Sequence, residues 1–228
     1  MNKFQIQETA RQLQVELWEQ RADIWPAREP SPFEILDPEL AAAHLGIGYA
    51  LNESLGKFGS RGMQFEVAGS LDRQRRIISI SRRFPSGTMR FTAAHEIGHW
   101  LLHPGEMMHR DKPVKGLETG LQYNRPEQEK EADYFATCFL MPEKLVRRTF
   151  ERLFGRNLAF DEAAAFELSP TDFGAFLRPH QNSLSRELIL ANAQRFNGVR
   201  FRSMAEQFGV SPTTMAIRLR ELNLTPWP

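Results

Sequence analysis

The chain has little of several features that mark special classes of protein. It has a single cysteine, Cys138, among 228 residues, so no disulfide can form within it and a reducing compartment is favoured. No apolar run reaches the roughly 18 residues that span a bilayer, and the first residues lack the apolar core of a signal peptide. We therefore expect a cytoplasmic protein that makes no membrane contact.

Neither sign of charge dominates the composition. The formal net charge is +1, which gives no overall electrostatic reason to expect binding to nucleic acid or membranes. The charge is uneven, however, because residues 181–228 carry six Arg and three Glu, a local net of +3 that leaves −2 for the rest. A partner attracted by positive charge is therefore expected at the C-terminal region.

Apolar residues at helical spacing predict several helices. One face of a first helix is formed by Ile6, Ala10, Leu13 and Leu17. Asp37 is a good N-cap for a second helix that ends near Gly46. Longer helices are expected from near Thr88 to Pro104 and over Glu127–Leu140, and shorter ones follow as far as residue 177.

Two strands are predicted before the helix that begins near Thr88. Residues 63–67 alternate apolar and polar side chains, and residues 76–81 are rich in β-branched side chains. Residues 69–72 are turn formers, so we expect an antiparallel pair joined there. The predicted fold class is α+β, with a small antiparallel sheet packed on the following helix.

The sequence Ala94-His95-Glu96-Ile97-Gly98-His99-Trp100 contains the pattern H-E-x-x-H. Two histidines four residues apart lie on one face of a helix, so both can reach one zinc ion. The carboxylate between them is suited to take a proton from the attacking water. We therefore predict His95 and His99 as metal ligands and Glu96 as the catalytic base.

A third ligand is expected from a separate element, because catalytic zinc usually has three protein ligands and an open position. The helix over Glu127–Leu140 offers Glu129, and Asp133 lies on the same face one turn later. We predict Glu129 as the third ligand and Asp133 as the carboxylate that orients a histidine. Glu131 is the alternative ligand.

Other side chains near the motif have weaker signals. His103 lies about 6 Å further along the helix axis than His99, so a capping or supporting role is expected rather than binding to the same ion. His109 and Tyr123, in the polar segment after the motif helix, are candidates for stabilising the transition state.

Both halves of this pattern resemble those of a known family. HEIGHWLLH at residues 95–103 and EKEADYFATCFLMP at residues 129–142 are similar to the ImmA/IrrE metallopeptidases. Their pattern is HE-x-GH-x-LLH, followed by E-x-E-A-(N/D)-x-FA-x-x-(L/F)-L-M-P. The similarity is close over residues 35–150 and looser beyond.

This resemblance implies a zincin-like, gluzincin-type fold in which an antiparallel sheet covers the active-site helix. It also implies Zn²⁺ as the cofactor, with Mn²⁺ as the alternative, and a helix-turn-helix repressor as the protein substrate. Three regions are then expected: an N-terminal helical arm over 1–30, a zincin-like metallopeptidase domain over 31–155, and an all-α C-terminal domain over 156–228.

The C-terminal region contains a segment, residues 202–215, that is typical of a helix-turn-helix. Gly209 permits the turn, and Ser211 with Pro212 begins the second helix. Met215, Leu219 and Leu222 form its predicted inner face. The predicted outward contacts to DNA or to a protein partner are Thr213, Thr214, Arg218 and Arg220.

Together these features favour a zinc-dependent endopeptidase that cleaves a helix-turn-helix repressor and relieves repression in a stress or mobile-element response. Glu96 would take a proton from the attacking water and deliver it to the leaving amine. The strand over residues 76–81 would hold the substrate as an added strand. The alternative function is a DNA-binding or protein-binding regulator whose peptidase-like domain binds metal without proteolysis. The sequence gives no oligomeric state.

Overall fold

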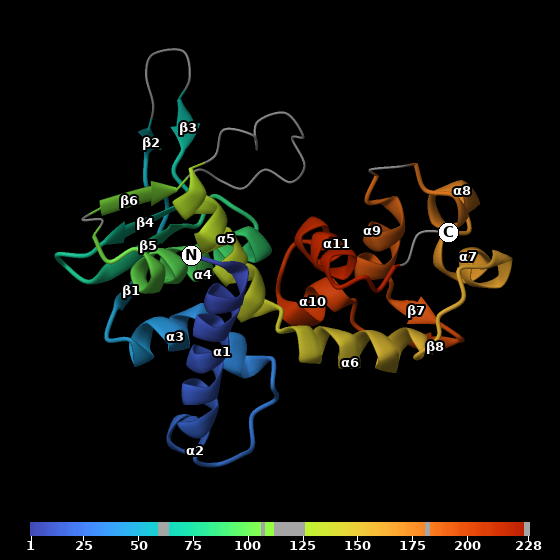
Figure 1. The fold of residues 1–228 in the computed structure, drawn as a ribbon, viewed down its shortest axis with the longest axis horizontal. Helices are drawn as coiled ribbons and strands as arrows, with labels where there is room; N and C mark the ends of the chain where they lie inside the picture. Colours follow the sequence, from blue (N-terminus) through green and yellow to red (C-terminus); the bar gives the residue numbers. More distant parts are fainter. Residues whose placement is uncertain (59–63, 106–107, 112–125, 181–182, 226–228) are drawn as a thin grey trace. The chain divides into compact units, whose positions relative to one another are not determined.

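The computed structural model describes residues 1–58, 64–105, 108–111, 126–180 and 183–225. The chain forms two compact units, Met1–Leu140 and Met141–Pro228, which we call unit 1 and unit 2. The fold is mixed α+β and mostly helical, with small sheets (Figure 1). No helix formed by the described residues is long and apolar enough to cross a membrane.

Unit 1 begins with helices and continues into a four-stranded sheet. Its helices are α1 (Lys3–Glu19), α2 (Arg21–Ile24), a short 3-10 helix (Glu34–Leu36), α3 (Pro38–His44), α4 (Ser86–Leu102) and α5 (Glu127–Leu140). Its strands are β1 (Gly48–Asn52), β2 (Lys57–Phe58), β3 (Phe65–Glu66), β4 (Gly69–Asp72), β5 (Ile77–Ser81) and β6 (Met108–Asp111).

The main sheet has the order β1-β5-β4-β6. β4 pairs antiparallel with both β5 and β6, but β1 pairs parallel with β5. The expectation of a purely antiparallel sheet was therefore wrong in this respect. β1 was missed because its sequence, Gly-Tyr-Ala-Leu-Asn, has little of the β-branched content that marks a strand.

Residues 69–72 form strand β4, so the prediction of a turn there was wrong. Gly69 has a packing role in this strand: a Cβ on it would lie 2.4 Å from Thr92 Cγ2 and 2.9 Å from Glu96 Oε1. The glycine lets helix α4 approach the sheet closely. The predicted strand over residues 63–67 is reduced to β3, which pairs with β2 in a separate two-stranded ribbon.

Helix α4 lies between the sheet and helix α5, and α1 packs on α5 (Figure 1). The predicted inner face of α1 is confirmed, since Ile6, Ala10, Leu13 and Leu17 are all buried. Asp37 caps α3 as predicted, accepting a hydrogen bond from the Glu39 amide. Gln14 of α1 also donates to the carbonyl oxygens of Cys138 and Phe139 near the end of α5.

Unit 2 contains a ribbon as well as helices, so the expected all-α composition was wrong. Its helices are α6 (Glu143–Phe154), α7 (Glu162–Leu168), α8 (Phe173–Leu177), α9 (Ser185–Asn192), α10 (Met204–Phe208) and α11 (Pro212–Glu221). The strands β7 (Arg195–Phe196) and β8 (Val199–Arg200) form a short antiparallel ribbon. Asn197 and Gly198 both have positive φ at its turn, the conformation that Asn-Gly hairpins favour.

The helix-turn-helix geometry predicted for the C-terminal region is present in α10 and α11. Gly209 adopts the left-handed conformation with φ 63°, and Ser211 accepts a hydrogen bond from the Thr214 amide at the start of α11. The predicted inner residues Met215, Leu219 and Leu222 are buried. This part of unit 2 therefore folds as the capping residues indicate.

Candidate metal centre

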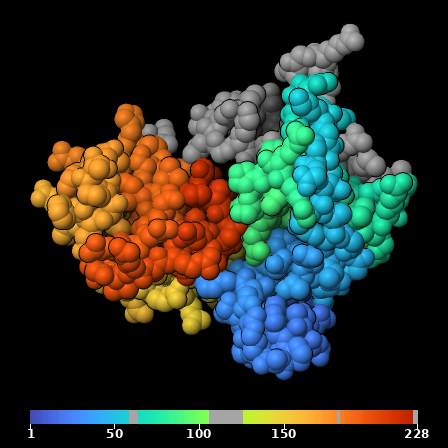
Figure 2. All heavy atoms as spheres, turned by 180° about the vertical axis from the view of Figure 1, so that it is seen from behind, coloured from blue at the N-terminus to red at the C-terminus, as the bar shows by residue number. Residues whose placement is uncertain are grey.

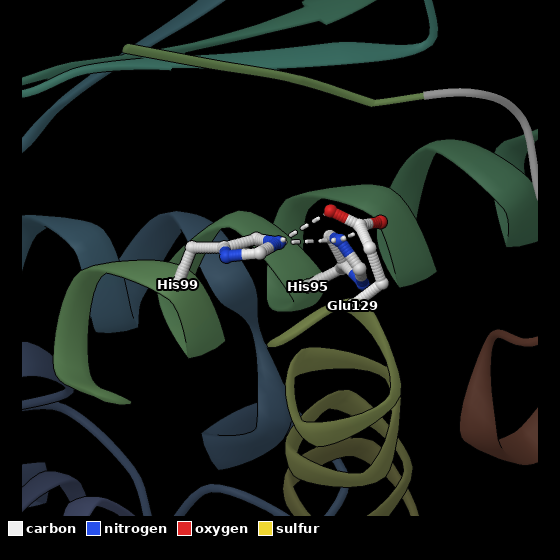
Figure 3. Close-up of side chains that lie close together, drawn as sticks. All are labelled: His95, His99 and Glu129. Carbon is white, nitrogen blue, oxygen red and sulfur yellow. Dashed lines mark hydrogen bonds and ion pairs between the residues drawn. The ribbon is translucent and has the colours of Figure 1, made fainter. Parts of the chain in front are cut away.

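The two histidines of the H-E-x-x-H pattern lie on α4, and Glu129 reaches them from α5 (Figure 3). His95 and His99 are 0% and 1% exposed, so their ring nitrogens are removed from bulk water. Each of the three residues offers one ligand atom, and these atoms lie within 4.8 Å of one another. The structure thus brings together the three side chains that the sequence selected.

The separations between these atoms fit a bound ion. His95 Nε2 and His99 Nε2 are 3.0 Å apart. The Glu129 carboxylate lies 3.6 Å from His95 Nε2 and 3.4 Å from His99 Nε2. A tetrahedral zinc ion with bonds of about 2.0–2.1 Å holds its ligand atoms roughly 3.3 Å apart. The measured separations lie on both sides of that value.

The hydrogen bonds on the far side of each ring indicate which nitrogen carries the proton. His95 Nδ1 lies 2.8 Å from Asp133 Oδ1, a carboxylate that accepts, so Nδ1 is protonated and Nε2 presents a lone pair. His99 Nδ1 has its own partner, His103 Nδ1, at 3.0 Å. The two Nε2 atoms and the Glu129 carboxylate converge on one point, an arrangement that a cation stabilises.

Asp133 and Glu129 are four residues apart on α5 and act on opposite sides of the same imidazole. Asp133 holds His95 at Nδ1, while Glu129 faces its Nε2. A carboxylate bonded to the outer nitrogen of a ligating histidine fixes the ring and raises its basicity. The structure therefore gives Asp133 the orienting position expected for it.

Close packing of two helices places Glu129 within reach of the histidines. A Cβ on Gly98 would lie 3.1 Å from Ala132 Cα and 3.2 Å from its carbonyl oxygen. Any larger side chain at this position would hold α5 further from α4. The small residues of the motif helix therefore serve the site directly, as the sequence indicated.

Glu96 is fully buried and projects toward β4 rather than into the ligand group. Its Oε1 would meet a Cβ on Gly69, which shows that the carboxylate lies against the sheet face of α4. This position, next to both histidines in sequence but outside the group of ligand atoms, suits a base better than a ligand.

His103 and Glu131 form a separate pair beside the site. His103 Nε2 lies 2.9 Å from Glu131 Oε2, so Glu131 is directed to His103 and not to the His95–His99 pair. The alternative in which Glu131 binds the ion does not agree with this geometry.

Sequence reasoning missed Arg73, in the turn between β4 and β5. One guanidinium nitrogen donates to the carbonyl oxygens of His99, Trp100 and His103 at distances of 2.6, 3.0 and 2.9 Å. The carbonyls of Trp100 and His103 lie at the end of the helix, where intrahelical donors run out, whereas the His99 carbonyl also accepts from the His103 amide. Arg73 therefore caps α4 next to the metal ligands, and only the tertiary structure reveals it.

The other candidate residues selected from the sequence are His109, Tyr123, Thr213 and Thr214. His109 lies on β6, opposite Leu71 of β4 in the register, while Tyr123 lies outside the described residues. Thr213 and Thr214 are half-buried at the start of α11.

The expectation that Arg218 and Arg220 point outward from α11 was wrong for Arg218 and only partly right for Arg220. Arg218 is 4% exposed and donates to the Met141 carbonyl oxygen. Arg220 forms an ion pair with the buried Glu187. Helical periodicity alone predicts an outward direction for both side chains. It does not take account of the acceptors elsewhere in unit 2 to which these guanidinium groups donate.

Comparison with known proteins agrees with the geometry of the site. The model of the family described as the IrrE N-terminal-like domain, Peptidase M78, matches residues 49–171, which is 123 of the 228 residues. A search of curated proteins gives no significant match. The matched segment includes α4 and α5 and so contains His95, His99 and Glu129. The chain therefore belongs to the IrrE N-terminal-like (Peptidase M78) family, as the resemblance of its motifs predicted.

Proposed function

We propose that the protein is a zinc-dependent endopeptidase that cleaves a helix-turn-helix transcriptional repressor and so relieves repression. The observation that supports this most strongly is the convergence of two imidazole nitrogens and the Glu129 carboxylate beside a buried Glu96. A site that only stabilised the fold would have no need of a further buried carboxylate next to its ligands.

In the proposed hydrolysis the metal ligands and Glu96 have different roles. His95, His99 and Glu129 would hold the ion, which when bound polarises the scissile carbonyl and lowers the pKa of water. Glu96 takes the proton of the attacking water and passes it to the leaving amine.

We assign the binding of the substrate peptide to the edge of β6 rather than to β5. The earlier expectation that residues 76–81 receive the substrate was wrong, since β5 lies between β1 and β4 and both of its edges are paired. Within the described sheet, β6 is an outer strand and lies against α4. An extended peptide could add to this edge through main-chain hydrogen bonds.

The test is incubation of the protein with a small helix-turn-helix repressor encoded next to its gene, followed by mass spectrometry of the products. We expect discrete fragments from the wild-type protein and none after treatment with a chelator, with activity restored by added zinc. The Glu96→Gln variant should bind zinc and cleave nothing. Fragments that form equally with Glu96→Gln would refute the proposal.

A non-proteolytic DNA-binding regulator is the second candidate, and one observation supports it. Lys144, Arg148 and Arg152 are exposed at intervals of four residues on α6, so they share one face of the helix. Figure 2 shows part of α6, in yellow, at the surface of unit 2. If DNA is bound, this stripe is better suited to phosphate contacts than α11, whose Arg218 is buried.

This candidate is tested by DNA binding at several salt concentrations. The double variant Lys144→Glu and Arg148→Glu should weaken binding and reduce its salt dependence by about one unit of slope for each lost phosphate contact. The matched control is Arg11→Glu with Arg75→Glu, which makes the same charge change on exposed residues of unit 1. Equal loss in both variants would mean that only net charge matters.

A further inference from the structure

The outer nitrogen of His99 is held by an imidazole, whereas that of His95 is held by a carboxylate. His99 Nδ1 lies 3.0 Å from His103 Nδ1, and His103 Nε2 lies 2.9 Å from Glu131 Oε2. All three side chains are buried, at 1%, 7% and 8% exposure for His99, His103 and Glu131. The chain of contacts therefore runs from a metal ligand through a second imidazole to a carboxylate, shielded from water.

The end of helix α4 explains how His103 reaches this position. His103 is the C-cap residue, with φ −125° and ψ 66°, so its backbone has already left the helical conformation. In a continuing helix its ring would lie a full turn beyond His99. Arg73 fixes this ending, because it donates to the carbonyl oxygens of both His99 and His103.

Only one set of proton positions satisfies both contacts when His99 Nε2 faces an ion. His99 must then carry its proton on Nδ1 and donate it to His103 Nδ1. His103 consequently carries its own proton on Nε2 and donates it to Glu131. Glu131 thus selects the tautomer of His103, and His103 in turn selects the tautomer of His99.

From this geometry we infer that His103 and Glu131 are positioning residues of the metal centre, which act on the ion through His99. This inference rests on the proposed function, since it takes the site to hold a metal. The pair does for His99 what Asp133 does for His95: it fixes the ring and makes Nε2 a better ligand. Both histidines of H-E-x-x-H are therefore hydrogen-bonded to a carboxylate of α5, His95 directly and His99 through His103.

The test measures zinc affinity by competition with a chelating dye, without any substrate. His103→Leu removes the acceptor of the His99 proton, and we expect the affinity to fall about 10–100-fold. His103→Asn can place its amide oxygen near the former Nδ1, and it should recover most of the affinity. Glu131→Gln keeps an acceptor for the His103 proton but removes the charge, so an intermediate loss is expected.

Two further readouts separate positioning from a general structural role. The visible absorption of the cobalt-substituted protein should change in His103→Leu, while the melting temperature of the metal-free form should change no more than in a control, His180→Leu. His180 is exposed and lies in unit 2, so its loss should leave both zinc affinity and the cobalt spectrum unchanged.

The outcomes are decisive in each direction. Wild-type zinc affinity in His103→Leu would overturn the inference, and so would an asparagine variant as weak as the leucine variant, because ring packing would then explain the effect. A wild-type protein that binds zinc but cleaves no repressor would refute the proposed function and leave this inference intact. A wild-type protein that binds no metal would refute both.

Discussion

Substitution of Gly98 by alanine tests how the two helices build the site. The new Cβ would lie 3.1 Å from Ala132 Cα and from Phe135 Cδ1, and 3.2 Å from the Ala132 carbonyl oxygen. Alanine gains about 1 kcal/mol of helix propensity over glycine, while overpacking costs about 1–3 kcal/mol. We therefore expect Gly98→Ala to lose up to about 2 kcal/mol of the free energy of unfolding.

The effect on zinc should exceed the effect on stability. Two of the close contacts are with backbone atoms, so α5 must move by a few tenths of an ångström. Metal–ligand distances tolerate only about ±0.2 Å, and Glu129 is carried on α5. We expect zinc affinity to fall about tenfold or more, measured by competition with a chelating dye.

A matched control is Gly105→Ala, since a Cβ there meets nothing within 4 Å. It should leave both zinc affinity and melting temperature unchanged. Wild-type zinc affinity in Gly98→Ala would refute the reasoning, because it would mean that the distance between α4 and α5 does not set the ligand geometry.

Three further predictions concern other parts of the chain. Gly69→Ala should reduce cleavage more than zinc binding, because the added Cβ would lie 2.9 Å from Glu96 Oε1; equal losses of both would contradict this. The Arg28 guanidinium lowers the pKa of the Glu34 carboxyl from 4.5 to about 2, so the stability this contact adds is complete above pH 4.5 and is lost as the pH falls toward 2. An NMR titration of Arg28→Ala should show the Glu34 midpoint moving back toward 4.5, and an unchanged midpoint would show that another group is responsible. Arg220→Ala should destabilise unit 2 by about 3 kcal/mol, since it removes the cationic partner of the buried Glu187 carboxylate and leaves it the hydrogen bond from the Thr225 hydroxyl; an unchanged melting temperature with weaker DNA binding would instead place Arg220 at an interface.

Local signals in the sequence were sufficient to predict most of the helices, though not α2 or α9, and the grouping of the metal-site residues. His95 and His99 share a face because of helical periodicity, and Glu129 with Asp133 repeats the same spacing on α5. Caps such as Asp37 and Ser211 mark helix starts because they satisfy amides within a few residues. These interactions are short-range, so the sequence alone carries them.

Features that depend on distant residues could not be predicted in this way. Gly69 and its neighbours have the composition of a turn but form a strand, because the close approach of Thr92 requires a glycine there. Arg218 has the pattern of an exposed residue but donates to the Met141 carbonyl oxygen, 77 positions away in the chain. The parallel pairing of β1 with β5 likewise joins segments that no local pattern connects.

The most direct test of the account is anomalous X-ray diffraction at the zinc edge from crystals grown with zinc. We predict one strong peak about 2.0–2.2 Å from His95 Nε2, His99 Nε2 and a Glu129 carboxylate oxygen, with Glu131 bonded to His103 and not to the ion. Two results would contradict the central claim. One is an anomalous peak within bonding distance of Glu131, and the other is the absence of a peak between His95 and His99 in crystals that hold zinc at full occupancy at another site.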